Sequence, residues 1–284
     1  MTNRAYRRRL DGAGRFRKST KKTPEGATRV TQSAPSYGPG VPMWVDLATR
    51  DVQASANFYG QLFGWQAEDM GEQAGHYTMF RQDGKMVGAV SPPMSPDTPP
   101  VWSTYFQTDD AAATAQKVRG AGGQVIVEPF AVMDQGTMGV FADPAGAVFC
   151  VWQPAAHRGA ELANTPYSFC WNELHTRDLA ATKNFYPRVF DWGVQANPMP
   201  EGGEYVEWQV NGRSIAGATN MQPGVPAEVP SYWLVYFAVA DCDATVSKAQ
   251  QLGARVMAPC MDIPQGRFAI LIDPQGATLG VIRV

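Results

Sequence analysis

Two stretches of this 284-residue chain decide its fold: NFYGQLFGW at residues 57–65 and NFYPRVFDW at residues 184–192. Each begins with Asn-Phe-Tyr and closes with a tryptophan two residues after a phenylalanine, and the two lie 127 residues apart. Both stretches read as the buried face and end of an amphipathic helix. Their recurrence indicates that the chain repeats itself.

A second marker, Asp-Pro-x-Gly-Ala before a final apolar run, recurs in the same order. It reads DPAGAVFCVW from Asp143 and DPQGATLGVI from Asp273, a spacing of 130 residues. Two markers at similar spacing predict a tandem duplication, joined by the Ala- and Pro-rich stretch QPAAHRGAELANTP. The predicted segments are a basic arm over 1–36, a first domain over 37–155, a linker over 156–164 and a second domain over 165–284.

Each repeat divides again into two similar units, and each unit opens with a strand that ends in aspartate. WVDLATRD precedes VQASANFYGQLF, and WNELHTRD precedes LAATKNFYPRVF. Aspartate is a favoured N-cap because its carboxylate accepts hydrogen bonds from the free N–H groups of the first helical turn. Three short strands with Gly, Pro and Asp turns follow each helix. The predicted unit is βαβββ, four times over, with the N-caps Asp51, Asp110, Asp178 and Asp241.

Charge is unevenly distributed, although the net value is only −2. Residues 1–29 hold ten of the 24 Arg and Lys but two of the 26 acids, which leaves 14 basic and 24 acidic residues in the rest. The arm has few apolar residues and is expected to be disordered. It is either a non-specific polyanion-binding arm or a solvated tail. The acidic body argues against specific nucleic-acid binding.

Localisation follows from what the composition lacks. No run of about 18 apolar residues is present and no apolar segment follows the basic start, so neither a membrane span nor a secretory signal is predicted. The cysteines form no CxxC pair, which fits free thiols in a reducing cytoplasm. They are Cys150, Cys170, Cys242 and Cys260. We expect a cytoplasmic protein, either a monomer or a homodimer.

Paired βαβββ modules resemble the vicinal oxygen chelate superfamily, which includes glyoxalase I, extradiol dioxygenases and bleomycin-resistance proteins. The resemblance covers about residues 41–284 and rests on the NFY…W helices, the DPxGA turns and the four strand-to-Asp entries. The tandem layout is similar to that of actinobacterial two-domain glyoxalase-like proteins. It implies an α+β fold in which each pair of modules curls a mixed sheet around a cavity. Function must still be argued from the site.

In metal-binding members of this superfamily, each domain takes four ligands, usually His, Gln or Glu, from the first and last strands of its modules. Carried over residue by residue, the eight positions hold Trp44, Ser103, Trp171, Leu234, Gly88, Cys150, Ala216 and Gly280. Hard divalent ions need oxygen or imidazole donors, and this set does not supply them. The resemblance therefore predicts no metal site and no cofactor.

The same resemblance places one side of these strands in the cavities. Side chains alternate along a strand, so Trp44 and Asp46 share the first cavity, and Trp171, Glu173 and His175 share the second. A Trp, an acid and a Tyr in each are typical of a small-molecule site. The candidate catalytic residues are Asp46, Glu173 and His175, and the candidate ligand-binding residues are Trp44, Ser103, Tyr105, Gln107, Cys150, Trp171 and Tyr236.

Structural roles compete with these assignments. The acids are alternatively held by backbone N–H groups or by Arg50 and Arg177, and the tryptophans by core packing. His175 either points into the cavity with Glu173 or bonds the adjacent loop. Because histidine titrates near neutrality unaided, we expect the second domain to hold the chemically more active pocket and the first mainly to bind.

Three functions remain open. The first is a metal-free protein that sequesters or transforms a hydrophobic or aromatic metabolite or antibiotic. The second is a lyase or isomerase that uses Asp46 or Glu173 as a base, or a metal that the sequence does not reveal. The third is an interaction protein whose cavities have collapsed around Trp44 and Trp171. The predicted partner is a small molecule.

Overall fold

The computed structural model describes residues 35–199, 202–222 and 224–284. Nearly all of the predicted basic arm lies outside these residues. The first half comprises β1 (Pro42–Ala48), α1 (Val52–Phe63), β2 (Gln66–Asp69), the 3-10 helix η1 (Glu72–Ala74), β3 (Thr78–Gln82), β4 (Lys85–Ser91), β5 (Val101–Gln107), α2 (Ala111–Gly120), β6 (Gln124–Val132), β7 (Gly136–Ala142) and β8 (Val148–Pro154).

Over its described residues, the second half repeats this order without a 3-10 helix. It comprises β9 (Phe169–Thr176), α3 (Leu179–Phe190), β10 (Gly193–Pro198), β11 (Glu204–Val210), β12 (Arg213–Asn220), β13 (Tyr232–Ala238), α4 (Cys242–Gln251), β14 (Arg255–Ile263), β15 (Gly266–Ile272) and β16 (Thr278–Arg283). The βαβββ unit thus occurs four times, and the predicted α+β fold class is confirmed.

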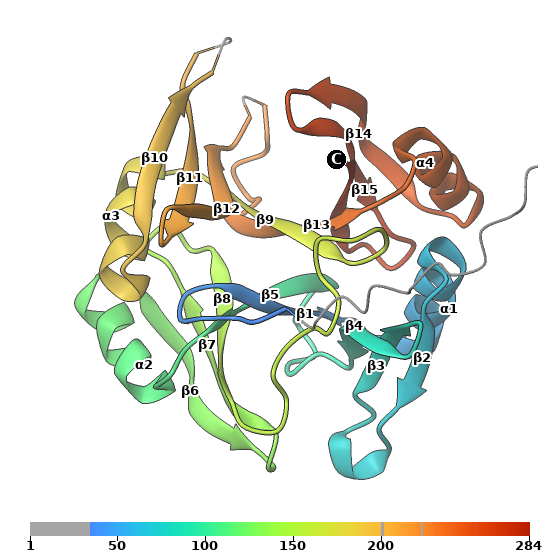
Figure 1. Cartoon of the computed structure of the whole chain (residues 1–284), viewed down its shortest axis with the longest axis horizontal. Helices are drawn as coiled ribbons and strands as arrows, with labels where there is room; N and C mark the ends of the chain where they lie inside the picture. Colours follow the sequence, from blue (N-terminus) through green and yellow to red (C-terminus); the bar gives the residue numbers. More distant parts are fainter. Residues whose placement is uncertain (1–34, 200–201, 223) are drawn as a thin grey trace, which may run out of the picture. The chain divides into compact units, whose positions relative to one another are not determined.

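Each half forms one eight-stranded mixed sheet (Figure 1). The first has the order β2-β3-β4-β1-β5-β8-β7-β6, and the second the matching order β10-β11-β12-β9-β13-β16-β15-β14. In the first sheet β1 and β5 pair antiparallel at the centre, while β1–β4 and β5–β8 are parallel. This arrangement brings the first strands of two modules side by side, so the residues chosen from β1, β5, β9 and β13 meet in pairs.

Local sequence signals account for where the helices begin and end. All four predicted aspartates cap their helices, and each carboxylate accepts from the third residue beyond it at 2.8–2.9 Å. Helices α2 and α4 are followed by glycines in the left-handed region, Gly122 at φ 91° and Gly253 at φ 95°. Only glycine adopts that conformation at little cost, so a glycine ends each of these two helices.

The two sequence markers meet each other across the halves. Tyr59 of the first NFY donates its hydroxyl to Asp273 of the second DPxGA turn at 2.8 Å, and it accepts from Trp102 Nε1 at 2.9 Å. Tyr186 of the second NFY donates to Asp143 of the first turn at 3.1 Å. Each duplicated pair is therefore a reciprocal contact between the halves, which explains why both markers recur together.

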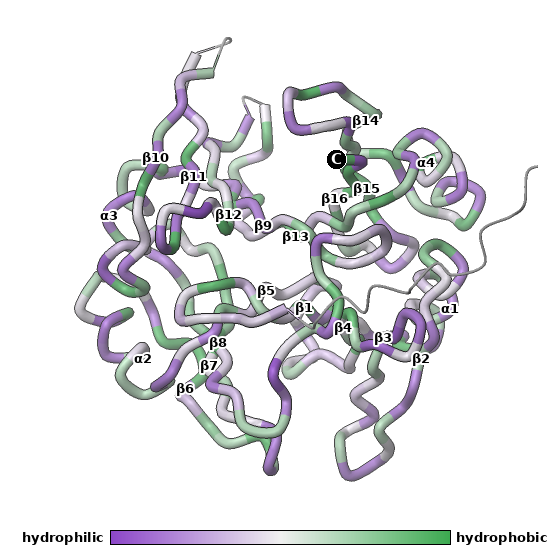
Figure 2. Tube along the Cα trace, viewed as in Figure 1, coloured by the Kyte–Doolittle hydropathy of each residue, from purple (hydrophilic) through white to green (hydrophobic). Residues whose placement is uncertain are grey.

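The tryptophans that end the two NFY stretches also form hydrogen bonds with the opposite half of the chain. Trp65 donates to the carbonyl of Tyr167, just before β9, and Trp192 donates to the carbonyl of Gly40, just before β1. One apolar core accordingly contains residues of both halves, such as Phe63 and Phe237. Hydrophilic residues gather away from it, for example around the turn between β2 and β3 (Figure 2). Within the described ranges, no helix has the length and apolar character needed to cross a membrane.

Candidate functional site

Each sheet has a face packed against helices and an opposite face, which we name the site face. Trp102 on β5 points to the helix side, because its Nε1 donates to Tyr59 of α1. Trp233 on β13 does the same toward Tyr186 of α3. Since side chains alternate along a strand, Asp46 and Glu173 lie on the opposite side of their sheets.

A chain of aromatic hydrogen bonds holds Asp46 on the first site face. Trp44 Nε1 donates to the hydroxyl of Tyr77 at 2.9 Å, and that hydroxyl donates to Asp46 Oδ2 at 3.1 Å. Tyr105 donates to the same oxygen at 2.8 Å. Burial raises the pKa of Asp46 to about 6, although the hydroxyl groups favour its charged form and oppose the shift.

The second site face carries the same chain. Trp171 Nε1 donates to the hydroxyl of Tyr205 at 2.9 Å, and Tyr205 donates to Glu173 Oε2 at 2.8 Å. Tyr236 donates to Glu173 Oε1 at 3.2 Å. The duplication has therefore kept a four-residue network, Trp–Tyr–acid–Tyr, in both halves.

One residue distinguishes the second network, namely His175. Its Nε2 lies 2.9 Å from Glu173 Oε1, at ion-pair distance. The imidazole ring stacks on Tyr232, with ring centroids 5.0 Å apart and planes inclined by 4°. His175 thus faces Glu173 rather than only the adjacent loop.

The contact with His175 helps to lower the pKa of Glu173, whereas burial alone would raise it. Burial acts to raise the pKa of Glu173, but the contact with His175 and the hydroxyl groups of Tyr205 and Tyr236 outweigh it, and the pKa lies below its usual value. Asp46 has no histidine beside it in its network, and burial raises its pKa instead.

The linker covers the first site face. Ala160 N donates to the carbonyl of Met43 at 2.9 Å, and Glu161 N donates to that of Met86 at 2.8 Å. These bonds run along the start of β1 and β4. The Glu161 carboxylate accepts from the backbone N–H of Met86 at 2.8 Å. The linker is therefore fixed by backbone pairing and is part of the first domain's surface.

His157 is the linker side chain that closes this face. Its ring packs edge-on against Trp44, at 4.4 Å between centroids, and against Trp152 at 5.5 Å. Burial lowers the pKa of His157 to about 4, so the ring is neutral at pH 7. Trp44, Asp46 and Cys150 on this face are buried.

The second site face is more open. Tyr236 is buried, but the other members of the network keep part of their surface exposed to solvent. The side chains of Glu173 and His175 are 14% and 12% exposed, respectively. The partly exposed residues around them are Trp171, Tyr205, Tyr232, Phe268 and Ile270. Aromatic surface therefore surrounds a partly exposed ionisable pair.

The remaining candidates have mixed placements. Ser103 is the β5 partner of Asp46 on the site face, and Cys150 adjoins Tyr105 in the parallel pair with β8. Gln107 is buried, but its amide donates to Asp109 at 2.9 Å and makes no hydrogen bond to Asp46. Its predicted place in the ligand-binding set is therefore not supported by contact with the network.

The arginines proposed as alternative partners of the acids lie elsewhere. Arg50 bonds the carbonyl of Pro96. Arg177 bonds the carbonyls of Pro226 and Val229, the latter at 2.8 Å from Nη2. Tyrosine hydroxyl groups, rather than arginines, therefore hold both acids.

Two of the eight positions carried over from metal-binding relatives are wrong by one residue. In β4 a β-bulge inserts an extra residue between Met86 and Gly88, which pair with the consecutive residues Arg81 and Phe80. In β12 a second bulge does the same between Ser214 and Ala216, which pair with Gln209 and Trp208. A one-residue shift exchanges the faces of a strand. Ala89 and Gly217, rather than Gly88 and Ala216, consequently lie beside Asp46 and Glu173.

The corrected positions fit a metal ion no better. The first site face offers Asp46 and Cys150 as ionisable donors, and the second offers Glu173 and His175. Throughout the described ranges, no cluster of three or more His, Cys, Asp or Glu is arranged to hold a metal. Ions such as Mn²⁺ prefer several oxygen or imidazole donors, so these donor sets do not match the superfamily's metal site.

Tyr77 and Tyr205 were not among the site residues predicted from the sequence, although each links the tryptophan to the acid in its network. A signal was available, because each follows a glycine by two residues and the two lie 128 residues apart. Tyr77 immediately precedes β3 and Tyr205 is the second residue of β11, so both lie at a strand end, where alternation in the sequence does not show which face a residue occupies.

Comparisons with known proteins agree with this architecture. The family model for the "Glyoxalase/Bleomycin resistance protein/Dioxygenase superfamily" matches residues 42–151 and 171–281. The chain is 41% identical over 263 residues to "Anthracycline biosynthesis protein DnrV" of Streptomyces peucetius, covering 87% of this chain and 94% of the relative.

A second relative and a solved structure extend the comparison. "Putative glyoxylase CFP32" of Mycobacterium tuberculosis is 40% identical over 253 residues, covering 87% of this chain and 96% of the relative. The Mn(II)-bound glyoxalase from Novosphingobium aromaticivorans superposes with a TM-score of 0.60 at 18% identity, covering 89% of this chain and 83% of that one. At that identity the likeness concerns the fold.

Proposed function

The chain belongs to the Glyoxalase/Bleomycin resistance protein/Dioxygenase superfamily, and from that premise we propose that it binds an aromatic small molecule on its second site face. The observation that carries the proposal is the partly exposed Glu173–His175 pair set among Trp171, Tyr205 and Tyr232. Aromatic walls with a few convergent polar groups are the usual composition of a ligand site.

The chemistry of the pair defines the ligand class. A carboxylate has about four acceptor positions, and three neighbours already use part of that capacity at Glu173. A ligand hydroxyl or N–H can donate to what remains, while its ring packs on Trp171 and Tyr232. The proposed ligand is therefore a planar aromatic compound that carries phenolic or similar donor groups.

The burial and the pKa of the two acids favour ligand binding over general-base catalysis. A general base works best with a pKa near the operating pH. Asp46 approaches this, with a pKa of about 6, but it is buried behind the linker. Glu173 is the more accessible acid, yet its pKa is lowered, which makes it a poor proton acceptor. The lyase or isomerase alternative would need one group with both properties.

The relative named for anthracycline biosynthesis points to the same ligand class. Anthracyclines are planar aromatic compounds with phenolic groups. We therefore propose a hydroxylated polycyclic metabolite or antibiotic as the ligand, sequestered or presented rather than transformed.

A fluorescence titration tests the proposal. 2,6-dihydroxyanthraquinone added to the full chain should quench tryptophan fluorescence and saturate. Glu173→Gln should weaken binding about tenfold or more, because a hydrogen bond involving a charged group contributes about 1.5–3 kcal/mol. The matched variant Asp46→Asn should bind as the unchanged protein does.

Metal dependence is tested in the same titration. Prior dialysis against EDTA, or addition of Mn²⁺, is expected to leave the binding curve unchanged, because the proposed site relies on Glu173, His175 and aromatic side chains. Binding that requires Mn²⁺ would favour the metal-dependent alternative, and absence of saturable binding would overturn the proposed ligand class.

A further inference from the structure

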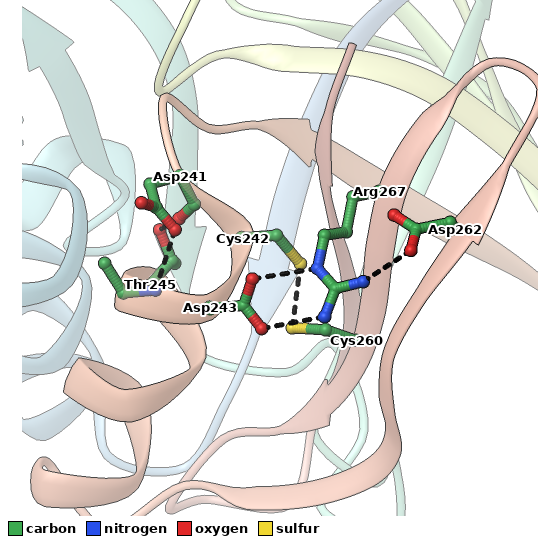
Figure 3. A network of polar contacts seen from close by, with 8 residues as sticks. Asp241, Cys242, Asp243, Thr245, Cys260, Asp262 and Arg267 are labelled. Carbon is green, nitrogen blue, oxygen red and sulfur yellow. Dashed lines mark hydrogen bonds and ion pairs between the residues drawn. The ribbon is translucent and has the colours of Figure 1, made fainter. Parts of the chain in front are cut away.

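Two cysteines distant in sequence meet beside helix α4. Cys242 is the first residue of α4 and Cys260 lies on β14. Their sulfur atoms are 3.1 Å apart, with both thiols free (Figure 3). A disulfide has its sulfur atoms about 2.05 Å apart, so a shift of about 1 Å would join them. Strand β14 is the last strand of its sheet, where a small shift disturbs one neighbour only.

Charged groups surround the thiols on their open side. Arg267 donates from Nε and Nη2 to the Asp243 carboxylate at 2.8 and 3.0 Å, and from Nη1 to Asp262 at 2.8 Å. Figure 3 shows Asp243 and Arg267 lying against the two sulfur atoms, with Asp262 beyond the arginine. The pair therefore lies next to a cation that favours thiolate and an anion that opposes it.

The two thiols are not equivalent. Cys242 is 1% exposed, and burial raises the pKa of its thiol to about 12. Cys260 is partly exposed, and burial also raises the pKa of its thiol. A peroxide in the solvent therefore reaches Cys260 before Cys242, which makes Cys260 the first nucleophile and Cys242 the resolving thiol.

We propose that Cys242 and Cys260 form a redox-modification site, a dithiol that hydrogen peroxide or an organic hydroperoxide converts reversibly to a disulfide. The Cys260 thiolate attacks a peroxide oxygen; the S–O bond forms, the O–O bond breaks and the leaving oxygen departs as water, or as an alcohol, after taking a proton. Cys242 sulfur then attacks the sulfenic sulfur, forming S–S and releasing a second water. Two thiols are oxidised and one peroxide is reduced.

The disulfide would tie the start of α4 to the edge strand β14. Both sites of attachment belong to the second half, and neither cysteine belongs to the Glu173 network. The proposal consequently does not depend on the proposed ligand. Raised thiol pKa values imply slow reaction at neutral pH, so the site would respond to sustained rather than brief exposure to peroxide.

The test uses the full chain, incubated with hydrogen peroxide, then unfolded and alkylated with iodoacetamide so that every free thiol reacts, and mapped by peptide mass spectrometry. The number of alkylated thiols should fall from four to two, with Cys242 and Cys260 in one linked peptide that dithiothreitol separates. The single variants Cys242→Ser and Cys260→Ser should form no intramolecular link. Cys150→Ser and Cys170→Ser are matched controls and should retain it.

A further variant tests whether the charged neighbours of the two thiols control how fast the disulfide forms. Asp243→Asn removes the carboxylate that opposes the Cys260 thiolate and should speed the loss of thiols. The proposal is overturned if all four thiols survive, if the link involves Cys150 or Cys170, or if Cys260 proceeds to sulfinic acid without pairing.

Discussion

The two site faces of this protein carry the same Trp–Tyr–acid–Tyr network but differ in what lies over it. On the first face the linker seats His157 against Trp44, and Trp44, Asp46 and Tyr105 are buried while Tyr77 is partly exposed. On the second face the matching Trp171 keeps part of its surface, and His175 lies 2.9 Å from the acid. A duplicated network therefore has two environments, one closed and one open.

The acids respond to these environments in opposite directions. Asp46 is desolvated and has no histidine beside it in its network, and its pKa rises. Glu173 is also desolvated, but its contact with His175 reverses the outcome. The comparison shows that the network fixes the geometry of each acid, whereas the cover and one added histidine set its charge.

The largest expected difference concerns the two tryptophans. Trp44→Ala should lower the free energy of unfolding by about 3–5 kcal/mol, because the removed side chain is buried and leaves a cavity. Trp171→Ala should cost clearly less, since that side chain is partly exposed. Urea unfolding of both variants measures the difference, and equal losses would show that the second face is as closed as the first.

The pH dependence of stability should separate the acids next. The pKa of Asp46 in the folded protein is raised from 3.8 to about 6. The contribution of protonated Asp46 to folding stability is therefore fully present below about pH 4 and is lost as pH rises through 6. Asp46→Asn should therefore gain about 3 kcal/mol relative to the unchanged protein between about pH 4 and pH 8.

Glu173→Gln should show the reverse slope. The folded pKa of Glu173 is lowered, so its stabilising contribution is present above the unfolded pKa and is lost as pH falls. The glutamine variant should therefore lose stability relative to the unchanged protein as pH rises. Thermal unfolding across pH tests both variants, and slopes of the same sign would contradict the electrostatic difference.

A smaller effect should come from unseating the linker. Gly159 has φ 97°, and a Cβ there would lie 2.6 Å from the carbonyl oxygen of Met43. Gly159→Ala should loosen the linker and raise the rate at which iodoacetamide labels Cys150, at a cost of about 1–3 kcal/mol. Gly71→Ala is the control, because Gly71 has φ 85° but open space around it. Equal labelling of Cys150 in both variants would mean that the linker does not cover it.

Much of the fold was predictable from local chemistry. The aspartate caps, the helix faces and the two duplicated markers specify four βαβββ units, because each signal acts over a few residues. The pairing of NFY with DPxGA was not visible, since a contact between residues 214 positions apart depends on how the halves pack. Recurrence alone suggested importance without showing the partner.

The site was predictable where strands are regular and not where they bulge or end. Alternation placed Trp44, Asp46, Trp171 and Glu173 on one face correctly, as it did Tyr105 and Tyr236. The bulges in β4 and β12 shifted the expected ligand positions by one residue, and bulges in β14 hid the approach of Cys260 to Cys242. The Ala- and Pro-rich linker gave no sign of the face it covers.

The most direct measurement of the difference between the faces uses fluorine NMR of protein containing 5-fluorotryptophan. Its eight tryptophans should give eight resonances, and Trp44→Phe and Trp171→Phe assign the two that matter. Addition of 2,6-dihydroxyanthraquinone should shift the Trp171 resonance and leave that of Trp44 unchanged. A shift of the Trp44 resonance with none at Trp171 would place the open site on the first face and contradict this account.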